Sequence, residues 1–319
     1  MEVGHIPVLA EEVMSMLVPA PGSLQIDATL GGGGHTERIL EATDPDGRLL
    51  GLDADGAAIA RVAGRLHPRF GDRLVLRQAN FRELGAVARA EGFGEVDGTL
   101  FDLGLSSYQL ADTERGFGFR AGGPLDMRFD TARGVPAAEL LATLSQDELT
   151  ALFRRYGEEP KARRIARAVV DARKTAPIAT AEDLAALVER VAPPNPRQTG
   201  RSGRRTHPAT RVFQALRIAV NEELDALQEG LAAAVDLLRP GGRLVVLSYH
   251  SLEDRIVKRF IAAERRGCVC PPELPACVCG RNPRLRLLTR KSVTPTSAEV
   301  EANPRARSAR LRAAERLAA

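Results

Sequence analysis

Short apolar runs alternate with amphipathic stretches through the first hundred or so residues of the chain. Glycine, proline or a carboxylate residue bounds each run, as expected for buried strands of a parallel sheet. The stretches between them, such as 35–42 and 55–66, place apolar residues at helical spacing. Because parallel strands need helical crossovers, this alternation predicts βαβ units. The predicted strands are 24–27, 48–52, 73–77 and 96–102.

The strand pattern stops after residue 102 and returns only near residue 243. Within the gap, Ser145-Gln146-Asp147-Glu148 and Thr180-Ala181-Glu182-Asp183 have the form of capping boxes, which begin helices. Apolar residues at helical spacing follow both of them. The gap therefore predicts a separate, all-helical unit.

The pattern of the first part resumes in the last third of the chain. Apolar residues recur every three or four positions over 213–238, which predicts one long amphipathic helix belonging to the sheet domain. Pro240-Gly241-Gly242 ends it, and a strand at 243–249 and a helix at 252–264 follow. We therefore predict a discontinuous sheet domain, 1–110 and 208–319, with an inserted helical subdomain, 111–207, that recognises the substrate.

Composition limits the class of protein. The chain has 319 residues, 44% hydrophobic and 27% charged, as in a globular protein of one large domain with an insertion, or of two domains. No apolar run reaches the length of a membrane span, and Met1-Glu2-Val3-Gly4-His5 has no signal-peptide pattern. The expected location is the cytoplasm, with no membrane partner.

Arginine is unevenly distributed, although the net charge is only +4. Clustered arginine favours a polyanionic partner such as RNA, and a solvated basic surface is the alternative for any one cluster. The clusters are Arg197, Arg201, Arg204, Arg205 and Arg211; Arg281, Arg284, Arg286, Arg290 and Lys291; and Arg305, Arg307, Arg310, Arg312 and Arg316.

Four consecutive glycines, Gly31 to Gly34, follow the first predicted strand, and Asp53 ends the second. Such a loop lets a ligand approach bare backbone, and a strand-end acid can accept hydrogen bonds from a ribose. A dinucleotide loop would carry a third glycine inside the next helix, but His35-Thr36-Glu37-Arg38 has none. The loop therefore favours S-adenosylmethionine over NAD, although a flexible turn or an NAD-dependent oxidoreductase remains an alternative. Asp27, Asp53 and Asp102, each at a strand end, are expected to line one crevice.

Several longer motifs resemble those of the bacterial 16S ribosomal RNA cytosine-N4 methyltransferases of the MraW or RsmH type. They extend from near residue 4 to near residue 316. The motifs are Gly4-His5-Ile6-Pro7-Val8-Leu9, Asp102-Leu103-Gly104-Leu105-Ser106-Ser107, Glu114-Arg115-Gly116-Phe117-Gly118-Phe119, Gly123-Pro124-Leu125-Asp126-Met127-Arg128, Tyr156-Gly157-Glu158-Glu159, His207-Pro208-Ala209-Thr210-Arg211, His250-Ser251-Leu252-Glu253-Asp254-Arg255 and Asn303-Pro304-Arg305-Ala306-Arg307-Ser308.

The resemblance implies a Rossmann-like α/β fold, that of a class I S-adenosylmethionine-dependent methyltransferase, closed by an antiparallel pair of strands near 285–289 and 309–314. It implies methyl transfer to the N4 amine of a cytidine in 16S ribosomal RNA of the small ribosomal subunit, the family's target being cytosine 1402. The oligomeric state stays open, with a homodimer as one alternative. The implied cofactor contacts are Gly33, Gly34, His35, Asp53, Phe81, Asp102 and Gln109.

Methyl transfer to an exocyclic amine benefits from a hydrogen-bond acceptor for its N–H, because the amine lone pair is delocalised into the ring. Asp102 is the predicted catalytic residue, with a purely cofactor-positioning carboxylate as the alternative. Ser106 and Ser107 are candidates to bind the base, with a helix N-cap as the alternative. Phe81, without the resemblance, would be assigned to the core. His250 either reaches the crevice or caps a helix.

All four cysteines lie close together as Cys268-Val269-Cys270 and Cys277-Val278-Cys279. Four thiolates can form a structural zinc site, but the one-residue gap within each pair is tighter than the usual two to four. We therefore predict reduced thiols and no metal, with a structural zinc site as the alternative; methyl transfer needs no metal. A non-catalytic RNA-binding factor with this fold is the last functional alternative, and Asp53 and Asp102 argue against it.

Overall fold

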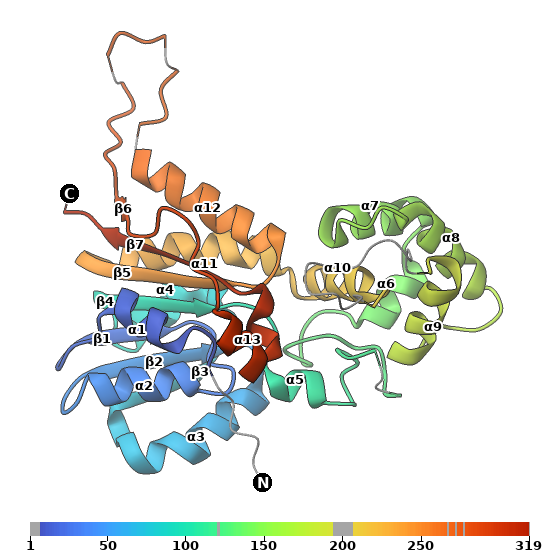
Figure 1. Ribbon diagram of the computed structural model, residues 1–319, viewed down its shortest axis with the longest axis horizontal. Coiled ribbons are helices and arrows are strands. Elements are labelled where there is room, and N and C mark those ends of the chain that lie inside the picture. The colour runs from blue at the N-terminus through green and yellow to red at the C-terminus, as the bar shows by residue number, and fades with distance from the viewer. Residues whose placement is uncertain are drawn as a thin grey trace. The chain divides into compact units, whose positions relative to one another are not determined.

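A computed structural model of the chain describes residues 7–119, 122–193, 207–266, 268–271, 273–276 and 278–318. The chain divides into two compact units (Figure 1). The sheet unit comprises Met1–Leu105 and Leu224–Ala319, and the helical unit comprises Ser106–Glu223. The sheet unit is therefore discontinuous, with the helical unit inserted in its sequence.

The sheet unit is built on one seven-stranded sheet with the order β3-β2-β1-β4-β5-β7-β6. The strands β1 to β5 are parallel, whereas β7 is antiparallel to both β5 and β6. The predicted parallel sheet and its antiparallel closing pair are both confirmed. The strands are β1 (Leu24–Asp27), β2 (Arg48–Asp53), β3 (Leu74–Gln78), β4 (Val96–Asp102), β5 (Leu238–Ser248), β6 (Leu285–Leu287) and β7 (Arg310–Arg316).

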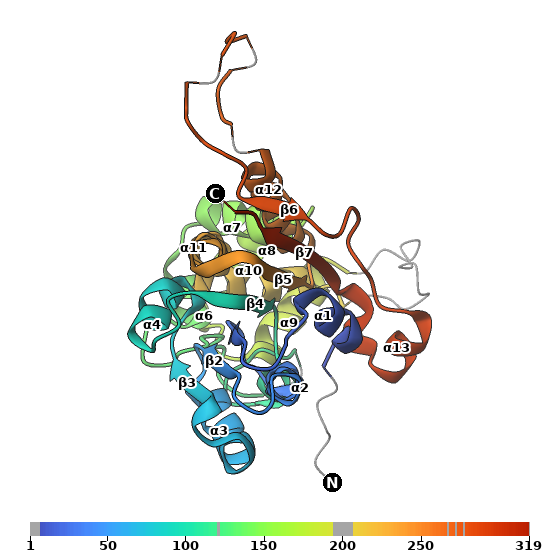
Figure 2. The same cartoon turned by 90° about the vertical axis from the view of Figure 1, so that its left-hand side faces the viewer.

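Helices cover both faces of the sheet and make a three-layer αβα unit (Figures 1 and 2). One layer contains α1 (Ala10–Leu17), α2 (Gly34–Ala42) and α3 (Gly56–Phe70), and the other contains α4 (Leu84–Ala90), α11 (Glu223–Leu237) and α12 (Ser251–Arg266). Alternate strand residues face the two layers: Leu49 and Leu100 pack with the first layer, and Leu50 and Phe101 pack with the second. A short helix, α13 (Ser297–Ala302), precedes β7, and 3₁₀ turns lie at Gly71–Arg73, Phe81–Glu83 and Pro304–Ser308.

The described residues of the helical unit form helices and no strand. The two predicted capping boxes are present: Ser145 with Glu148 begins α7, and Thr180 with Asp183 begins α9. Each satisfies two backbone N–H groups that the first helical turn leaves without a partner. The helices are α5 (Ser107–Ala111), α6 (Ala137–Thr143), α7 (Gln146–Gly157), α8 (Ala162–Ala172), α9 (Ala181–Val191) and α10 (Thr210–Asn221). The predicted fold class, a Rossmann-like sheet with an inserted helical subdomain, is confirmed.

The single long helix predicted over 213–238 is wrong. Glu222, in the left-handed conformation with φ 49°, ends α10, and α11 begins directly after it. Helix α10 belongs to the helical unit, where it packs on α7; a Cβ on Gly157 would lie only 2.5 Å from the carbonyl oxygen of Arg211. Helix α11 packs on the sheet. Apolar spacing continues through the junction, so it cannot distinguish two helices that bury their faces in different units.

None of the helices in the described part of the chain combines the length and the apolar composition that a membrane span needs.

Candidate active site

The sheet unit has one topological switch point, where the strand order reverses between β1 and β4. In open α/β sheets, ligands bind at such a point, outside the carboxyl ends of the strands. Asp27 ends β1, Asp53 ends β2 and Asp102 ends β4. The structure therefore brings the three predicted acids to the same edge of the sheet, and we call this place the acid-rimmed edge.

The glycine loop between β1 and α2 turns sharply at the acid-rimmed edge. Gly31 and Gly33 both have positive φ, 51° and 74°, a conformation that side chains disfavour. A Cβ on Gly33 would also lie 2.9 Å from Cγ1 and Cγ2 of Val62. Glycine is required here, and it exposes the backbone at the start of α2, the helix that carries Gly34 and His35.

Asp53 is held by the backbone on both of its oxygens. The N–H of Gly31 donates to Oδ2 at 2.8 Å, and the N–H of Asp55 donates to Oδ1 at 2.9 Å. Burial raises the pKa of Asp53 to about 6, against the effect of these two hydrogen bonds. Because each carboxylate oxygen can accept about two hydrogen bonds, Asp53 retains acceptor capacity for a pair of ribose hydroxyls.

Asp27 is fully buried and serves the architecture of the same loop. Thr36 donates its hydroxyl to Oδ2 at 2.7 Å, which connects the end of β1 to α2. The backbone N–H of Thr29 donates to Oδ1 at 3.2 Å. Burial raises the pKa of this carboxyl to about 6. Asp27 therefore fixes the loop and adds negative potential to the edge.

Asp102 ends β4 and faces side chains from two other elements. The hydroxyl of Tyr249 donates to its Oδ1 at 2.7 Å, and Nε2 of His35 lies 3.6 Å from its Oδ2. The backbone N–H of Asp102 donates to the hydroxyl of Thr29 at 2.5 Å, which connects the ends of β4 and β1. Burial raises the pKa of Asp102 to about 7, and the hydrogen bond from Tyr249 opposes that rise. A carboxyl that titrates near neutral pH at a strand end is a common feature of catalytic sites.

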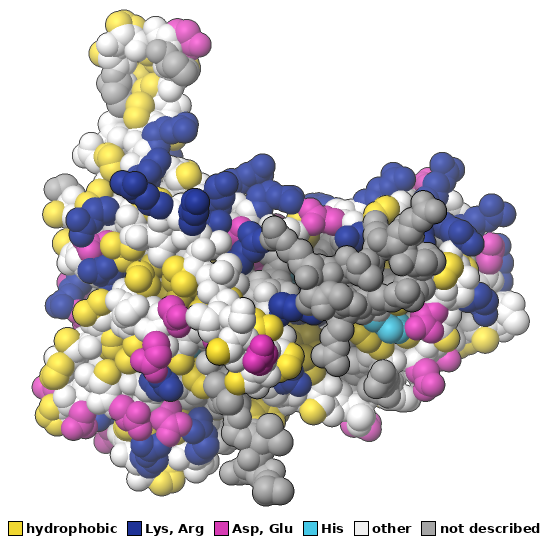
Figure 3. Space-filling model, in the orientation of Figure 1, with side chains coloured by type: hydrophobic (Ala, Val, Ile, Leu, Met, Phe, Trp, Pro, Cys, Tyr) yellow, Lys and Arg dark blue, Asp and Glu magenta, His cyan; other side chains and the backbone are white. Residues whose placement is uncertain are grey.

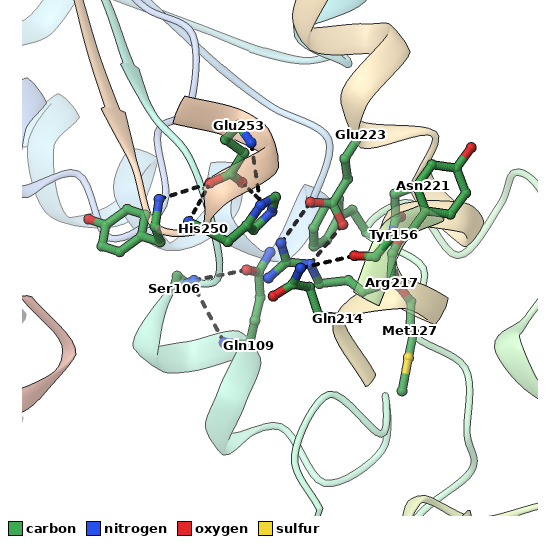
Figure 4. Close-up of polar contacts among 12 residues, drawn as sticks. Ser106, Gln109, Met127, Tyr156, Gln214, Arg217, Asn221, Glu223, His250 and Glu253 are labelled. Carbon is green, nitrogen blue, oxygen red and sulfur yellow. Dashed lines mark hydrogen bonds and ion pairs between the residues drawn. The ribbon is translucent and has the colours of Figure 1, made fainter. Parts of the chain in front are cut away.

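Tyr249, which directly follows β5, was missed as a site residue. Its backbone N–H donates to Oε2 of Glu253 at 2.8 Å, and the N–H of His250 donates to the same oxygen at 3.2 Å (Figure 4). In return, the N–H of Glu253 donates to Nδ1 of His250 at 3.4 Å, so His250 caps the start of α12. Glu253 thereby fixes the backbone that carries the Tyr249 ring. The strand-end rule that selected the three acids would also have selected Tyr249.

Phe81, one of the cofactor contacts implied by the resemblance, lies in the 3₁₀ turn after β3, and its ring packs edge-on against Phe101 with the ring centroids 5.8 Å apart. The ring is partly buried against the core on the α11 side of the sheet. This packing supports the core interpretation of Phe81, and its contact with a nucleoside stays a prediction.

Three predicted site residues belong to the helical unit rather than to the sheet unit. Ser106 is the N-cap of α5, and it accepts a hydrogen bond from the N–H of Gln109 at 3.2 Å. The side-chain oxygen of Gln109 in turn accepts from the N–H of Ser106 at 3.0 Å, which completes a capping box (Figure 4). The expected capping role of Ser106 is therefore present. The base contacts of Ser106 and Ser107 and the cofactor contact of Gln109 stay predictions.

Some predictions fall on residues outside the described part of the chain. These are the arginines from Arg197 to Arg205, His5 and Cys277.

The sheet topology and the acid-rimmed edge are those of a class I methyltransferase, whose cofactor is S-adenosylmethionine. The residues fit this group: the glycine loop admits close approach, Asp53 suits a ribose diol, and the three acids suit a cationic sulfonium and ammonium. A family model described as the MraW methylase family matches residues 2–317. The chain belongs to this family.

Curated relatives of the chain match it over nearly its whole length. Ribosomal RNA small subunit methyltransferase H of Thermomicrobium roseum is 57% identical over 98% of this chain and 94% of its own length. The protein of the same name from Syntrophotalea carbinolica is 51% identical over 98% of both chains. Among solved structures, an rRNA methylase from Streptococcus thermophilus gives a TM-score of 0.44 at 11% identity, over 97% of this chain and 94% of that one.

Proposed function

We propose that the protein transfers the methyl group of S-adenosylmethionine to the N4 amine of a cytidine in 16S ribosomal RNA, at cytosine 1402, within the small ribosomal subunit. The family and its rRNA methyltransferase relatives support the reaction class and the RNA substrate. The observation that carries the chemistry is Asp102, partly buried at the switch point and hydrogen-bonded by Tyr249. A ribosomal substrate also favours a cytoplasmic location.

The cofactor, when bound, supplies a methyl group on an electron-poor sulfonium. The protein aligns the amine with that methyl and excludes water, which together account for much of the rate gain in such a displacement. An ionised Asp102 accepts a hydrogen bond from the amine and concentrates electron density on its nitrogen. Transfer would form a nitrogen–carbon bond and break the sulfur–carbon bond of the bound cofactor, and Asp102 would take up the amine proton before it passes to water. The carbonyl oxygens of Leu103 and Gly104, directly after β4, are additional acceptors for the second amine hydrogen.

The helical unit is our candidate for RNA recognition. Three exposed arginines, Arg163, Arg164 and Arg167, lie along α8, while Ile165 and Val169 on its other face are buried. Lys and Arg side chains are visible over α7 and α8 and, in the sheet unit, over α12 (Figure 3). Because each phosphate contact releases counterions, replacing these three arginines by glutamine should reduce the salt dependence of binding to small subunits. An unchanged salt dependence would mean that these three arginines do not contact RNA phosphates and form a solvated surface.

The reaction is tested on small subunits isolated from cells that lack the activity, with mass spectrometry of the digested ribosomal RNA. We expect one methyl group on the exocyclic nitrogen of the proposed cytidine. At saturating cofactor, Asp102→Asn should lower kcat by about 10²-fold or more, in addition to weakening cofactor binding through the loss of its charge, whereas Asp53→Ala should weaken cofactor binding by about 1–3 kcal/mol. The exposed Asp72 provides the control, since Asp72→Asn should change neither quantity.

Methylation at another nucleotide or another atom would reject the target, and an active Asp102→Asn variant would reject the catalytic assignment of Asp102. If Asp102→Asn instead lost cofactor binding alone, the carboxylate would only position the cofactor. Binding of small subunits without any methyl transfer would favour the non-catalytic alternative.

A further inference from the structure

A cluster of cysteine thiols lies away from the acid-rimmed edge, in the segment that joins α12 to β6. The Sγ atoms of Cys268, Cys270 and Cys279 all lie within 4.8 Å of one another. The Sγ atoms of Cys268 and Cys279 are 3.8 Å apart, far beyond the length of about 2.05 Å of a disulfide bond. The segment extends from the end of α12 and returns to β6, so its two ends are neighbours (Figures 1 and 2). The three thiols therefore converge from both arms of the segment.

We propose that Cys268, Cys270 and Cys279 bind one Zn²⁺ ion as a structural clip. In a tetrahedral zinc site each sulfur lies about 2.3 Å from the metal, which puts neighbouring sulfurs about 3.8 Å apart. The distance between Cys268 and Cys279 matches this edge length. The sequence objection was the one-residue gap within each cysteine pair. Cys268 and Cys270 are such a pair, but their Sγ atoms and that of Cys279 from the other arm all lie within 4.8 Å of one another, so the short gap does not prevent the three thiols from converging.

A backbone hydrogen bond supports the thiolate form of the cluster. The N–H of Val278 donates to Sγ of Cys270 at 3.4 Å. Backbone N–H groups directed at sulfur orient metal ligands and stabilise the negative charge that zinc coordination requires. Three ligands leave one tetrahedral position, which a water molecule can fill.

The segment also lacks the apolar core that would order it without a metal or covalent cross-link. Among its described residues from 268 to 283, no apolar side chain is buried, and none of these residues lies in a helix or strand. Val269, Leu274 and Val278 are exposed by 62%, 44% and 77%. A segment without an apolar core gains its order from disulfides or metals, and the thiol geometry favours a metal. The ion would fix the two arms of the segment against each other.

The test measures metal content in the full-length chain, purified under reducing conditions without chelators. Elemental analysis should give one zinc per chain. Cys268→Ser and Cys279→Ser should each lose it, whereas the neighbouring variants Val269→Ser and Val278→Ser should keep it. Because all four cysteines of the chain lie in this segment, thiol titration reports on the site alone: the thiols should react slowly until a chelator removes the metal. Cobalt(II) in place of zinc should give the absorption of a tetrahedral thiolate site.

A second measurement separates loss of metal from loss of fold. Removing zinc from the wild-type chain should speed hydrogen exchange between α12 and β6 and leave the protection of β1, β2 and β4 unchanged. Zinc far below one per chain with rapidly reacting thiols would overturn the proposal. A disulfide found by mass, or iron in place of zinc, would overturn it as well.

Discussion

Replacing Tyr249 by phenylalanine tests whether its hydroxyl sets the pH dependence of methyl transfer. Tyr249 donates to Asp102 at 2.7 Å, and this hydrogen bond stabilises the ionised carboxylate. Burial raises the pKa of Asp102 to about 7, the Tyr249 hydrogen bond lowers it, and the carboxylates of Asp27 and Glu253 raise it further. Without the hydroxyl, the opposing contribution is lost. The pKa of Asp102 should therefore rise above 7 in Tyr249→Phe.

The size of the shift follows from the strength of a charged hydrogen bond. Such a bond contributes about 1.5–3 kcal/mol, and one pKa unit corresponds to about 1.4 kcal/mol, so the bond accounts for roughly one to two units. The Asp102 side chain is 19% exposed, so water can replace part of the lost bond. We therefore expect the pKa to rise by roughly one unit.

The assay is kcat/KM for methylation of small subunits, measured from about pH 5.5 to about pH 9. In the proposed mechanism an ionised Asp102 is the active form, so activity should fall as pH decreases through its pKa. The acidic limb of the Tyr249→Phe profile should lie about one pH unit higher, with a similar plateau at alkaline pH. Tyr156→Phe removes a hydroxyl from α7 of the helical unit and should leave the limb in place. Coinciding limbs for Tyr249→Phe and wild type, both folded by circular dichroism, would refute the role of the hydrogen bond.

Three further predictions concern stability and cofactor binding. Gly33→Ala should lower the free energy of unfolding by about 1–3 kcal/mol, because Gly33 has a φ of 74° and a Cβ there would lie 2.9 Å from Val62. Gly64→Ala, in open space within α3, should raise the free energy of unfolding by up to about 1 kcal/mol, and thermal unfolding measures both variants. Asp254→Ala should lower the free energy of unfolding by about 3 kcal/mol or more, because Asp254 accepts hydrogen bonds from the buried Arg312 guanidinium at 2.7 and 3.2 Å. Adding Arg312→Met should recover part of that loss, and urea unfolding that shows no recovery would contradict the buried-charge explanation. Affinity for S-adenosylmethionine should rise as pH increases through the pKa values of the three strand-end acids, about 6 to 7. The rise should be steeper than for S-adenosylhomocysteine, which lacks the sulfonium charge, and equal slopes in calorimetry would mean that these acids do not interact with that charge.

Most of the sheet could be predicted because its strands are short apolar runs with clear stops. The predicted strands 24–27 and 96–102 coincide with β1 and β4, β2 is one residue longer than predicted at its end, and β3 is shifted by one residue at both ends. Capping boxes located α7 and α9 because the N-cap and the N3 residue recognise each other locally. Structure that depends on interactions within a few residues can be predicted without knowing the rest of the fold.

The end of α10 could not be predicted because nothing local announces it. Glu222 takes the left-handed conformation that glycine or asparagine usually occupies at a helix end, so no residue type at this position predicts the end of the helix. What ends the helix is tertiary: α10 packs in one unit and α11 in the other. The Tyr249 hydrogen bond was hidden for a similar reason, since the two residues that it joins are 147 positions apart.

The charge of the acid-rimmed edge explains why a phosphate-free cofactor suits this fold. Asp27, Asp53 and Asp102 all have pKa values raised by burial, and the charge of Asp27 adds to the rise at the other two. A pyrophosphate brought to the same edge would increase this repulsion in a poorly screened site, whereas a sulfonium and an ammonium would relieve it. The missing third glycine and the cluster of acids therefore both disfavour a dinucleotide. The loop lacks the glycine that a dinucleotide site uses for close helix packing, and the carboxylates beside it repel an anion, so both features favour a cationic nucleoside.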